Sequence, residues 1–415
     1  MIRRFLAPGS IGSPQFIAAT LLLVYLLQCA WLIHVETVHG SLPDSNHDLC
    51  IYHGLEQWKG GAIAGTPETL RAESVTGTPS SGHGGHLRVR DGYDRDHSPL
   101  YYLTCAAPFV VKPPALRTES PLGQLWATAP YLFFGVMLGG SLWYVSRRLY
   151  GNAGGYIALT LYCFSPGLIV GVAGAPNLGE MGGVWGTFGT VFTAIAVAHT
   201  LYAPREVILW NYRRILLLGL SFALVVGNQF SLALMLPVGL LLMFWVAPVR
   251  PRAVIVIWFA AVAVGAVLLF ASYFFRPALL WQGILHARWI DIEPAAFAMS
   301  ASYSRTVRML AASSPALMLA LPVTVITYFA WGRTRYFGNT APLAIAALLF
   351  ILAVASPDFP GQGFHLVLLV FLFVFVAGVF ADLLETRYSL LVTAGVFGLL
   401  SAASLRNLLQ LIFLR

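Results

Sequence analysis

The sequence predicts an all-α, polytopic membrane protein of about 11 transmembrane helices, with a long polar loop after the first helix. Hydrophobic residues make up 58% of the chain and charged residues only 10%, and the mean hydropathy is +0.75. Soluble domains carry about 25% charged residues. The apolar residues also gather in long runs separated by short polar stretches. A water-soluble fold is therefore excluded.

The net charge of +8 does not indicate nucleic-acid binding. Only Lys59 and Lys112 are lysines, and the arginines fall mainly in short groups between apolar runs. Such groups are typical of topology signals, because arginine is retained on the cytoplasmic side of a membrane. We therefore expect membrane lipids, and no nucleic acid, among the partners.

The chain begins with a short basic segment, residues 1–14, which is the expected cytoplasmic N-terminus. Residues 15–34 then give the first transmembrane helix. A cleaved signal peptide has a shorter apolar core and a small-residue cleavage site, which the segment from Trp31 to Glu36 does not offer. We expect this helix to be retained.

Ten further apolar runs lie in the remaining bundle, residues 123–415. Polar residues and a proline interrupt the stretch from 215 to 246, so it forms either two short helices or one bent helix. The expected spans are 123–145, 154–173, 183–201, 215–231, 232–247, 253–274, 309–330, 341–356, 365–381 and 388–404.

The arginine positions test this arrangement. With the N-terminus inside, five groups of arginines fall in cytoplasmic loops: Arg147/Arg148, Arg205/Arg213/Arg214, Arg250/Arg252, Arg333/Arg335 and Arg387. The alternate loops then face outward: 35–122, 174–182, 275–308 and 357–364. We therefore expect a multi-pass inner-membrane protein whose outer loops face the periplasm.

The first outer loop, residues 35–122, has two ordered flanks around an insertion rich in Gly, Ser and Thr at 60–92. The residues after Asp48 predict a short helix at the membrane surface, with Ile51, Leu55 and Trp58 on one side. The stretch from Pro99 to Val111 is too short to span and predicts a second interfacial helix.

Neither histidines nor cysteines of this loop define a site. His83 and His86 lie in the Gly-rich insertion, which offers no fixed geometry, so we expect a solvated loop and no metal site there. Cys50 and Cys105 could pair in an oxidising periplasm, but their spacing alone does not fix a disulfide.

Two short motifs carry a family resemblance. The loop reads Asp48-Leu49-Cys50-Ile51-Tyr52 and later His97-Ser98-Pro99-Leu100. With the order of spans, this resembles the polytopic glycosyltransferases of the GT-C fold, in the branch of protein O-mannosyltransferases and the lipid A aminoarabinose transferase. That branch typically has Asp-Glu-x-x-Tyr and His-Pro-Pro-Leu.

The resemblance implies a GT-C-like fold and transfer of a sugar from a polyprenyl-phosphate donor, with inversion, on the periplasmic face. It assigns Tyr52 and His97 to substrate binding. Leu49 departs from the pattern by replacing the second acid, and Ser98 by replacing the first proline. A non-catalytic member that keeps the fold is therefore an open alternative.

The chemistry of such a transfer needs a carboxylate that takes the acceptor proton. We expect Asp48 to be this general base; alternatively it caps the surface helix, since Asp favours helix starts. Glu36 and Asp44 are rival bases. Glu180, in the second outer loop, is the other catalytic candidate. An acid at the entrance of a membrane span costs free energy unless it is paired or hydrated, so such an acid is a candidate for function. Alternatively, Glu180 only interacts favourably with the dipole of a helix N-terminus.

Cationic side chains in the later outer loops are candidates for holding the leaving phosphate. Arg288 and Arg305 suit phosphate with their planar donor forks, although arginines beside a span also snorkel to lipid headgroups. His365, at the entrance of a helix, either contacts the phosphate or caps the loop. No cofactor is indicated, and a divalent cation at the phosphate is left open.

Other classes of site are missing from the sequence. It has no Gly-rich phosphate loop, no Cys/His metal spacing and no His-Glu-x-x-His motif. Its cytoplasmic loops are too short for a nucleotide-binding domain, which disfavours a nucleotide-sugar donor. Acids inside spans are scarce, which disfavours a proton-coupled transporter. The open alternatives are a non-catalytic subunit or scaffold of a membrane complex, and a polyprenyl-phosphate carrier or flippase. The acceptor, whether lipid, glycan or protein, is not indicated.

Overall fold

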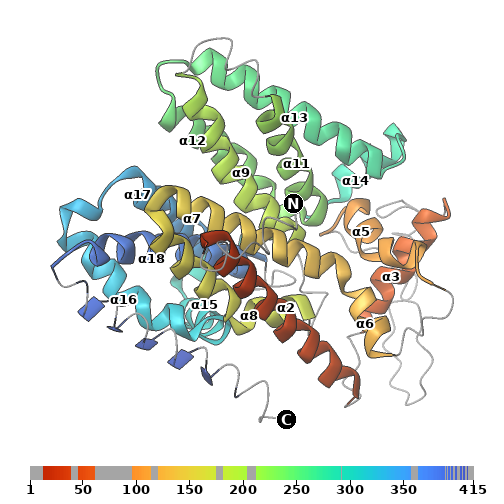
Figure 1. The fold of residues 1–415 in the computed structure, drawn as a ribbon. Helices are drawn as coiled ribbons and strands as arrows, with labels where there is room; N and C mark the ends of the chain where they lie inside the picture. The colour runs from red at the N-terminus through yellow and green to blue at the C-terminus, as the bar shows by residue number, and fades with distance from the viewer. Residues whose placement is uncertain are drawn as a thin grey trace. The chain divides into compact units, whose positions relative to one another are not determined.

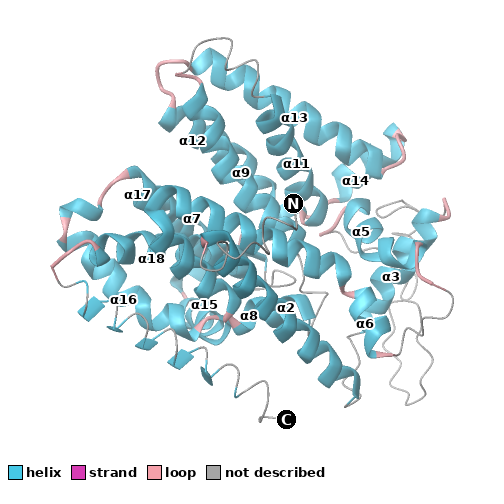
Figure 2. Ribbon diagram, in the orientation of Figure 1, coloured by secondary structure: helices cyan, strands magenta, loops and turns pink. Residues whose placement is uncertain are grey.

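The computed structural model describes residues 13–38, 45–60, 96–113, 120–173, 181–202, 212–290, 292–356 and 363–387, with scattered positions from 389 to 409. For residues 45–49 and 363 it describes the backbone only. Within these ranges every regular element is an α-helix or a 3-10 helix, and no strand occurs (Figure 2). The predicted all-α class is confirmed.

The chain divides into two compact units, each built from separate stretches of sequence. Unit 1 comprises Met1–Leu42, Tyr131–Met181 and Ile292–Arg415. Its elements are α2 (Pro14–Val38), most of α7 (Ala129–Cys163), α8 (Pro166–Ala173), η3 (Pro294–Ala298), α15 (Ser300–Ser313), α16 (Pro315–Ala330), η4 (Gly332–Thr334), α17 (Phe337–Ala355) and α18 (Gly363–Leu384) (Figure 1).

Unit 2 comprises Pro43–Pro130 and Gly182–Asp291. It contains both flanks of the first outer loop together with the middle of the bundle. Its elements are α3 (Ser45–Trp58), α5 (Pro99–Val110), α6 (Pro121–Ala127), nearly all of α9 (Met181–Thr200), α11 (Tyr212–Asn228), η2 (Phe230–Leu234), α12 (Met235–Val246), α13 (Pro251–Ser272) and α14 (Pro277–His286).

Five of the described helices are long and apolar enough to cross a membrane: α2, α9, α13, α17 and α18. Two bent pairs raise the number to seven if each pair is one span: α6 with α7, bent by 60°, and α15 with α16, bent by 116°. A multi-pass membrane protein is therefore confirmed, and its first span agrees with the expected one. The expected number of about 11 spans is not shown, because several apolar runs form helices that are short or broken.

Gly151 turns α7 back on itself. Its φ of 75° lies in the left-handed region, which glycine occupies without a side-chain clash. After the turn, the Tyr162 hydroxyl donates to the Gly135 carbonyl before the turn at 2.6 Å. The parts of the two expected spans, 123–145 and 154–173, that lie in α7 thus fold against each other.

Three turns that the arginine pattern assigns to one side of the membrane meet in unit 1. The Tyr150 hydroxyl donates to the Gly338 carbonyl at 2.5 Å. The Asn339 amide nitrogen donates to Asp382 at 3.1 Å. These bonds join the turn of α7, the start of α17 and the end of α18. We call Tyr150, Asn339 and Asp382 the turn cluster.

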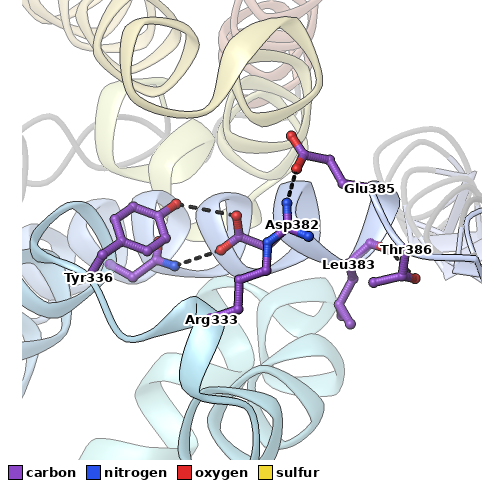
Figure 3. Close-up of polar contacts among 7 residues, drawn as sticks. Arg333, Tyr336, Asp382, Leu383, Glu385 and Thr386 are labelled. Carbon is purple, nitrogen blue, oxygen red and sulfur yellow. Dashed lines mark hydrogen bonds and ion pairs between the residues drawn. The ribbon is translucent and has the colours of Figure 1, made fainter.

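Figure 3 shows the polar contacts around Asp382. The Tyr336 hydroxyl donates to the second carboxylate oxygen of Asp382 at 3.5 Å, and Arg333 forms an ion pair with Glu385. Burial, followed by the negative charge of Asp382, raises the pKa of Tyr336. The phenol therefore stays protonated and can donate. The exposed ion pair adds little, because water screens it.

The interrupted stretch from 215 to 246 forms two short helices. α11 ends at Asn228, α12 begins at Met235, and the 3-10 turn η2 joins them. α11 packs closely on α13, where a Cβ on Gly219 would lie 2.6 Å from Val264. The break between α11 and α12 therefore belongs to a packed part of unit 2, and it positions the candidate site.

Candidate functional site

Helix α3, which contains the first motif, packs in unit 2 against α5, which begins within the second motif. A Cβ on Gly54 would overlap the Tyr102 carbonyl oxygen and lie 2.5 Å from the Ala106 side chain. The Trp58 indole N–H donates to the Leu103 carbonyl at 3.1 Å. Because Gly54 has no side chain, the backbones of the two helices approach closely. The stretch after Asp48 is thereby held against the helix that follows His97.

The side of α3 that faces the protein is not the predicted apolar side. Cys50 is 4% exposed and Gln57 is fully buried. Ile51 and Leu55 are only half-buried, and Trp58 is 47% exposed. Cys50, Gly54 and Gln57 recur at helical spacing and form the buried side, because Gly54 lets the α5 backbone approach closely.

Ser98 connects the start of α5 to the end of α11. Its hydroxyl oxygen accepts from the Leu100 N–H at 3.1 Å, which caps α5. The same hydroxyl donates to the Gly227 carbonyl at 2.7 Å. The Phe230 N–H donates to the Asp96 carbonyl at 2.9 Å. Segment 96–98 therefore supplies hydrogen-bond partners for backbone groups that the break after α11 exposes.

Buried polar side chains mark this break. Asn228 is 3% exposed, Gln229 is fully buried and Ser231 is 1% exposed. The Asn228 amide nitrogen donates to the Leu224 carbonyl at 2.9 Å. For Gln229, neither polar side-chain atom has a hydrogen-bond partner among the described residues. A buried amide without a partner costs about 1–3 kcal/mol. A buried amide that costs free energy calls for an explanation, and a place in a functional site is one. The break is therefore a candidate part of the site.

Aromatic rings flank the same break. The His97 ring stacks on Tyr101 with 4.1 Å between ring centroids and an interplanar angle of 21°. The Trp289 ring lies 5.3 Å from Phe230, the first residue of η2. Arg288, next to Trp289, is half-buried. Segments far apart in sequence thus bring the Trp289 ring to the break itself, and the His97–Tyr101 ring pair to the segment that is bonded to it.

The predicted site residues of unit 2 are Tyr52, His97, Arg288 and Asp48. Tyr52 is 50% exposed on α3, and His97 is 8% exposed directly before α5. The Asp48 backbone lies in α3, but its side chain is outside the described part. Glu180 lies wholly outside the described residues.

The other two predicted substrate-binding residues, Arg305 and His365, lie in unit 1. Arg305 is half-buried on α15. His365 is 5% exposed near the start of α18. The Met309 backbone of α15 lies beside its ring, outside normal hydrogen-bond geometry. Arg305 and Met309 are one helical turn apart on α15.

Comparisons with known proteins give one structural likeness. No family model matches the chain, and no curated protein matches its sequence. A solved structure resembles it. This is the archaeal oligosaccharyltransferase AglB from Archaeoglobus fulgidus, in complex with an inhibitory peptide and a dolichol-phosphate. The TM-score is 0.47 at 12% sequence identity, and the match covers 78% of this chain and 47% of that one. The chain thus spans about half the length of that protein.

Cysteines and metal-ligating residues do not add to the site as described. Cys50 and Cys105 are both buried and neither is part of a disulfide, so the bridge that the sequence left open is not formed. No group of three or more His, Cys, Asp or Glu side chains gathers within the described ranges. The insertion that carries His83 and His86 lies outside those ranges.

Asn228 and Gln229 are not predicted as site residues, because in the sequence they only interrupt an apolar run. Their place beside Ser98 emerges from the tertiary contacts. The signal that identifies them is a pair of adjacent amides within an apolar stretch, since polar groups at membrane depth are costly and tend to be functional.

Ser98→Ala is expected to lower the free energy of unfolding by about 1–3 kcal/mol, because it removes a helix cap and a buried hydrogen bond to Gly227. Thermal unfolding of the purified protein in detergent measures this. Ser304→Ala is the matched control, because its hydroxyl bonds the Ala301 carbonyl on an exposed surface. We expect that variant to stay within about 0.5 kcal/mol of the parent. Equal melting of both variants would contradict the assigned role of Ser98.

Proposed function

We propose that this chain is an inner-membrane glycosyltransferase that moves a sugar from a polyprenyl-phosphate donor to an acceptor on the periplasmic face. In this proposal the chain has about 11 spans and a cytoplasmic N-terminus, as the arginine pattern predicts. The outer loops then supply the catalytic and binding groups.

The packing of α3 on α5 is the observation that supports this proposal most. The segments that carry Asp48 and His97 are separated by the insertion at 60–92, yet α3, which contains Asp48, contacts α5, which begins just after His97, around Gly54. A site assembled from both motif segments needs this proximity. The break at Gln229 adds buried polar groups next to the His97 segment.

The proposed step is a displacement at the anomeric carbon of the sugar. A nucleophilic group of the acceptor attacks this carbon, and the bond to the phosphate oxygen breaks. The phosphate leaves with the bonding electron pair, and Asp48 takes the proton of the acceptor group. Glu180 is the second proposed catalytic acid. The donor polyprenyl phosphate is released with its full charge.

Stabilising that charge is the proposed task of the cationic and polar groups. Arg288 and Arg305 offer planar donor forks that match phosphate oxygens. His365 and His97 offer ring nitrogens, and Tyr52 offers a hydroxyl group. A divalent cation bound with the donor phosphate would supply the same charge stabilisation.

Asp48→Asn tests the proposal. We expect glycosyl transfer to fall by about 100-fold to 10,000-fold, the range typical of a lost general base. The readout is polyprenyl phosphate released from native lipid extracts, measured by mass spectrometry. Glu56→Gln is the matched control, because it removes another acid of α3, one that is ion-paired to Lys59 at 3.3 Å. Unchanged release by Asp48→Asn with an intact fold would overturn the role of Asp48.

A non-catalytic membrane subunit or scaffold of the same fold is the second candidate. The hydrogen bonds of Ser98 favour it, because this motif position serves to cap α5 and to contact Gly227. Leu49 in place of a second acid points the same way. Such a subunit gives no sugar transfer in any variant. A flippase would move labelled polyprenyl phosphate across vesicles without forming a glycosidic product.

A further inference from the structure

Helix α13 ends in an unusual turn of bulky residues. Phe274 has a φ of 53° and Phe275 a φ of 56°, both in the left-handed region. L residues are crowded there, and glycine is the usual occupant at a helix end. Two consecutive phenylalanines in this conformation persist only where the surrounding contacts hold them.

The contacts that hold this turn form a Schellman motif. The Phe275 N–H donates to the Phe270 carbonyl at 3.2 Å, and the Phe274 N–H donates to the Ala271 carbonyl at 2.9 Å. The Phe270 and Phe275 rings meet edge to face with 5.4 Å between centroids. This ring contact is the apolar pair that usually accompanies the motif, and it fixes the direction in which the chain leaves α13.

The short helix α14 follows the turn and folds back on it. Tyr273, which caps α13, is 1% exposed. A Cβ on Gly283 of α14 would lie 2.9 Å from a ring carbon of Tyr273, so the helix backbone rests on this ring. The Gly283 side of α14 therefore faces the protein.

The opposite side of α14 is apolar and exposed. Trp281 is 62% exposed and Leu285 is 61% exposed, and these two residues are one helical turn apart. Phe275, at the turn, is also 61% exposed. A helix facing water would carry polar residues in these places, so this side is built for an apolar surrounding.

Two observations point to the bilayer surface as that apolar surrounding. Helix α13 is a membrane span with strongly exposed apolar side chains, including Val256 at 67% and Phe259 at 61%, and only residues 273–276 separate it from α14. Within 273–290 the sequence has Arg276, His286 and Arg288 but no acid. Basic residues beside an apolar helix side suit lipid headgroups.

We propose that α14 is an interfacial helix that lies in the membrane surface at the end of α13, with Trp281 and Leu285 inserted among the lipids. Ten residues are too few to span. The helix ends close to Trp289, which contacts Phe230 at the break after α11. Binding of α14 to lipid thus ties the Arg288–Trp289 segment to the bilayer. The proposal is independent of the enzymatic activity.

Site-directed spin labelling of the full chain tests this placement. Trp281→Cys, Leu285→Cys and His286→Cys are each labelled in vesicles of phosphatidylcholine and phosphatidylglycerol. His286 is the matched control, because it is exposed on α14 but lies off the Trp281–Leu285 side. The four native cysteines are buried, and the labelled parent chain gives the background.

The readout is relaxation of each label by oxygen, which dissolves in lipid, and by a water-soluble nickel chelate. We expect labels at 281 and 285 to respond to oxygen at a depth of about 5–10 Å below the headgroup boundary, and the label at 286 to respond to nickel. Nickel access at all three positions would overturn the proposal. Labels at 281 and 285 shielded from both reagents would overturn it in favour of a protein occupant.

Discussion

Gly54→Ala is expected to disrupt the packing of α3 on α5 and to destabilise unit 2. The added Cβ would overlap the Tyr102 carbonyl oxygen and lie 2.9 Å from the carbonyl carbon. Overpacking usually costs about 1–3 kcal/mol. Here the obstacle is helix backbone, which cannot rotate away, so we expect a loss of at least about 3 kcal/mol. Thermal unfolding in detergent measures the loss, and hydrogen exchange of residues 45–60 and 96–110 locates it.

Gly239→Ala is the control for this variant, because it places the same methyl group on α12 in unit 2. There the nearest atom is a Thr190 side-chain methyl at 3.2 Å, which can shift by a few tenths of an ångström. Alanine also favours a helix over glycine by up to about 1 kcal/mol. We expect little change in melting. A Gly54→Ala protein that melts like this control would refute the close contact between α3 and α5.

Gly378→Ala is expected to open the turn cluster of unit 1 and to destabilise that unit by at least about 3 kcal/mol. A Cβ there would overlap the Asn339 amide oxygen and lie 2.6 Å from the Tyr150 ring. Neither neighbour can move cheaply. The Asn339 amide nitrogen bonds Asp382 and the Thr334 carbonyl, and Tyr150 is tied to the start of α17.

The control for the turn cluster is Gly140→Ala in α7, because a Cβ on Gly140 meets nothing within 4 Å. We expect that protein to melt at or slightly above the parent temperature. Melting is followed for both variants in the same detergent. A Gly378→Ala protein as stable as Gly140→Ala would show that α18 does not pack on Asn339 and Tyr150 as described.

Helices α5 and α3 show which features of the fold local sequence patterns predict and which they do not. The stretch after Ser98 predicts a helix from Pro99 to Val111, and α5 runs from Pro99 to Val110. Proline at the first position and serine at the cap are local signals, so no tertiary information is needed. The side on which α3 packs is not predicted, because it depends on Gly54 meeting a helix that lies far along the chain.

The candidate site divides in the same way. Tyr52 and His97 are predicted from the family resemblance and Arg288 from its residue type and position, and all three fall in unit 2. The spacing of residues in the sequence does not predict that Ser98 bonds Gly227. Nor does it predict that Gln229 is buried beside segment 96–98. In the sequence, the break between α11 and α12 is visible only as polar residues that interrupt an apolar run. Hydropathy carries no information about which distant segment packs against that break.

The sequence by itself determined the membrane class, the all-α fold and the position of the first span. Each depends on composition and on local apolar length, which a bilayer selects directly. Only the tertiary structure decided that α3 packs on α5 through Gly54, that segment 96–98 bonds the break after α11, and that the turn cluster joins three turns. These contacts depend on close backbone approach and on hydrogen bonds between segments far apart in the chain, and hydropathy records neither.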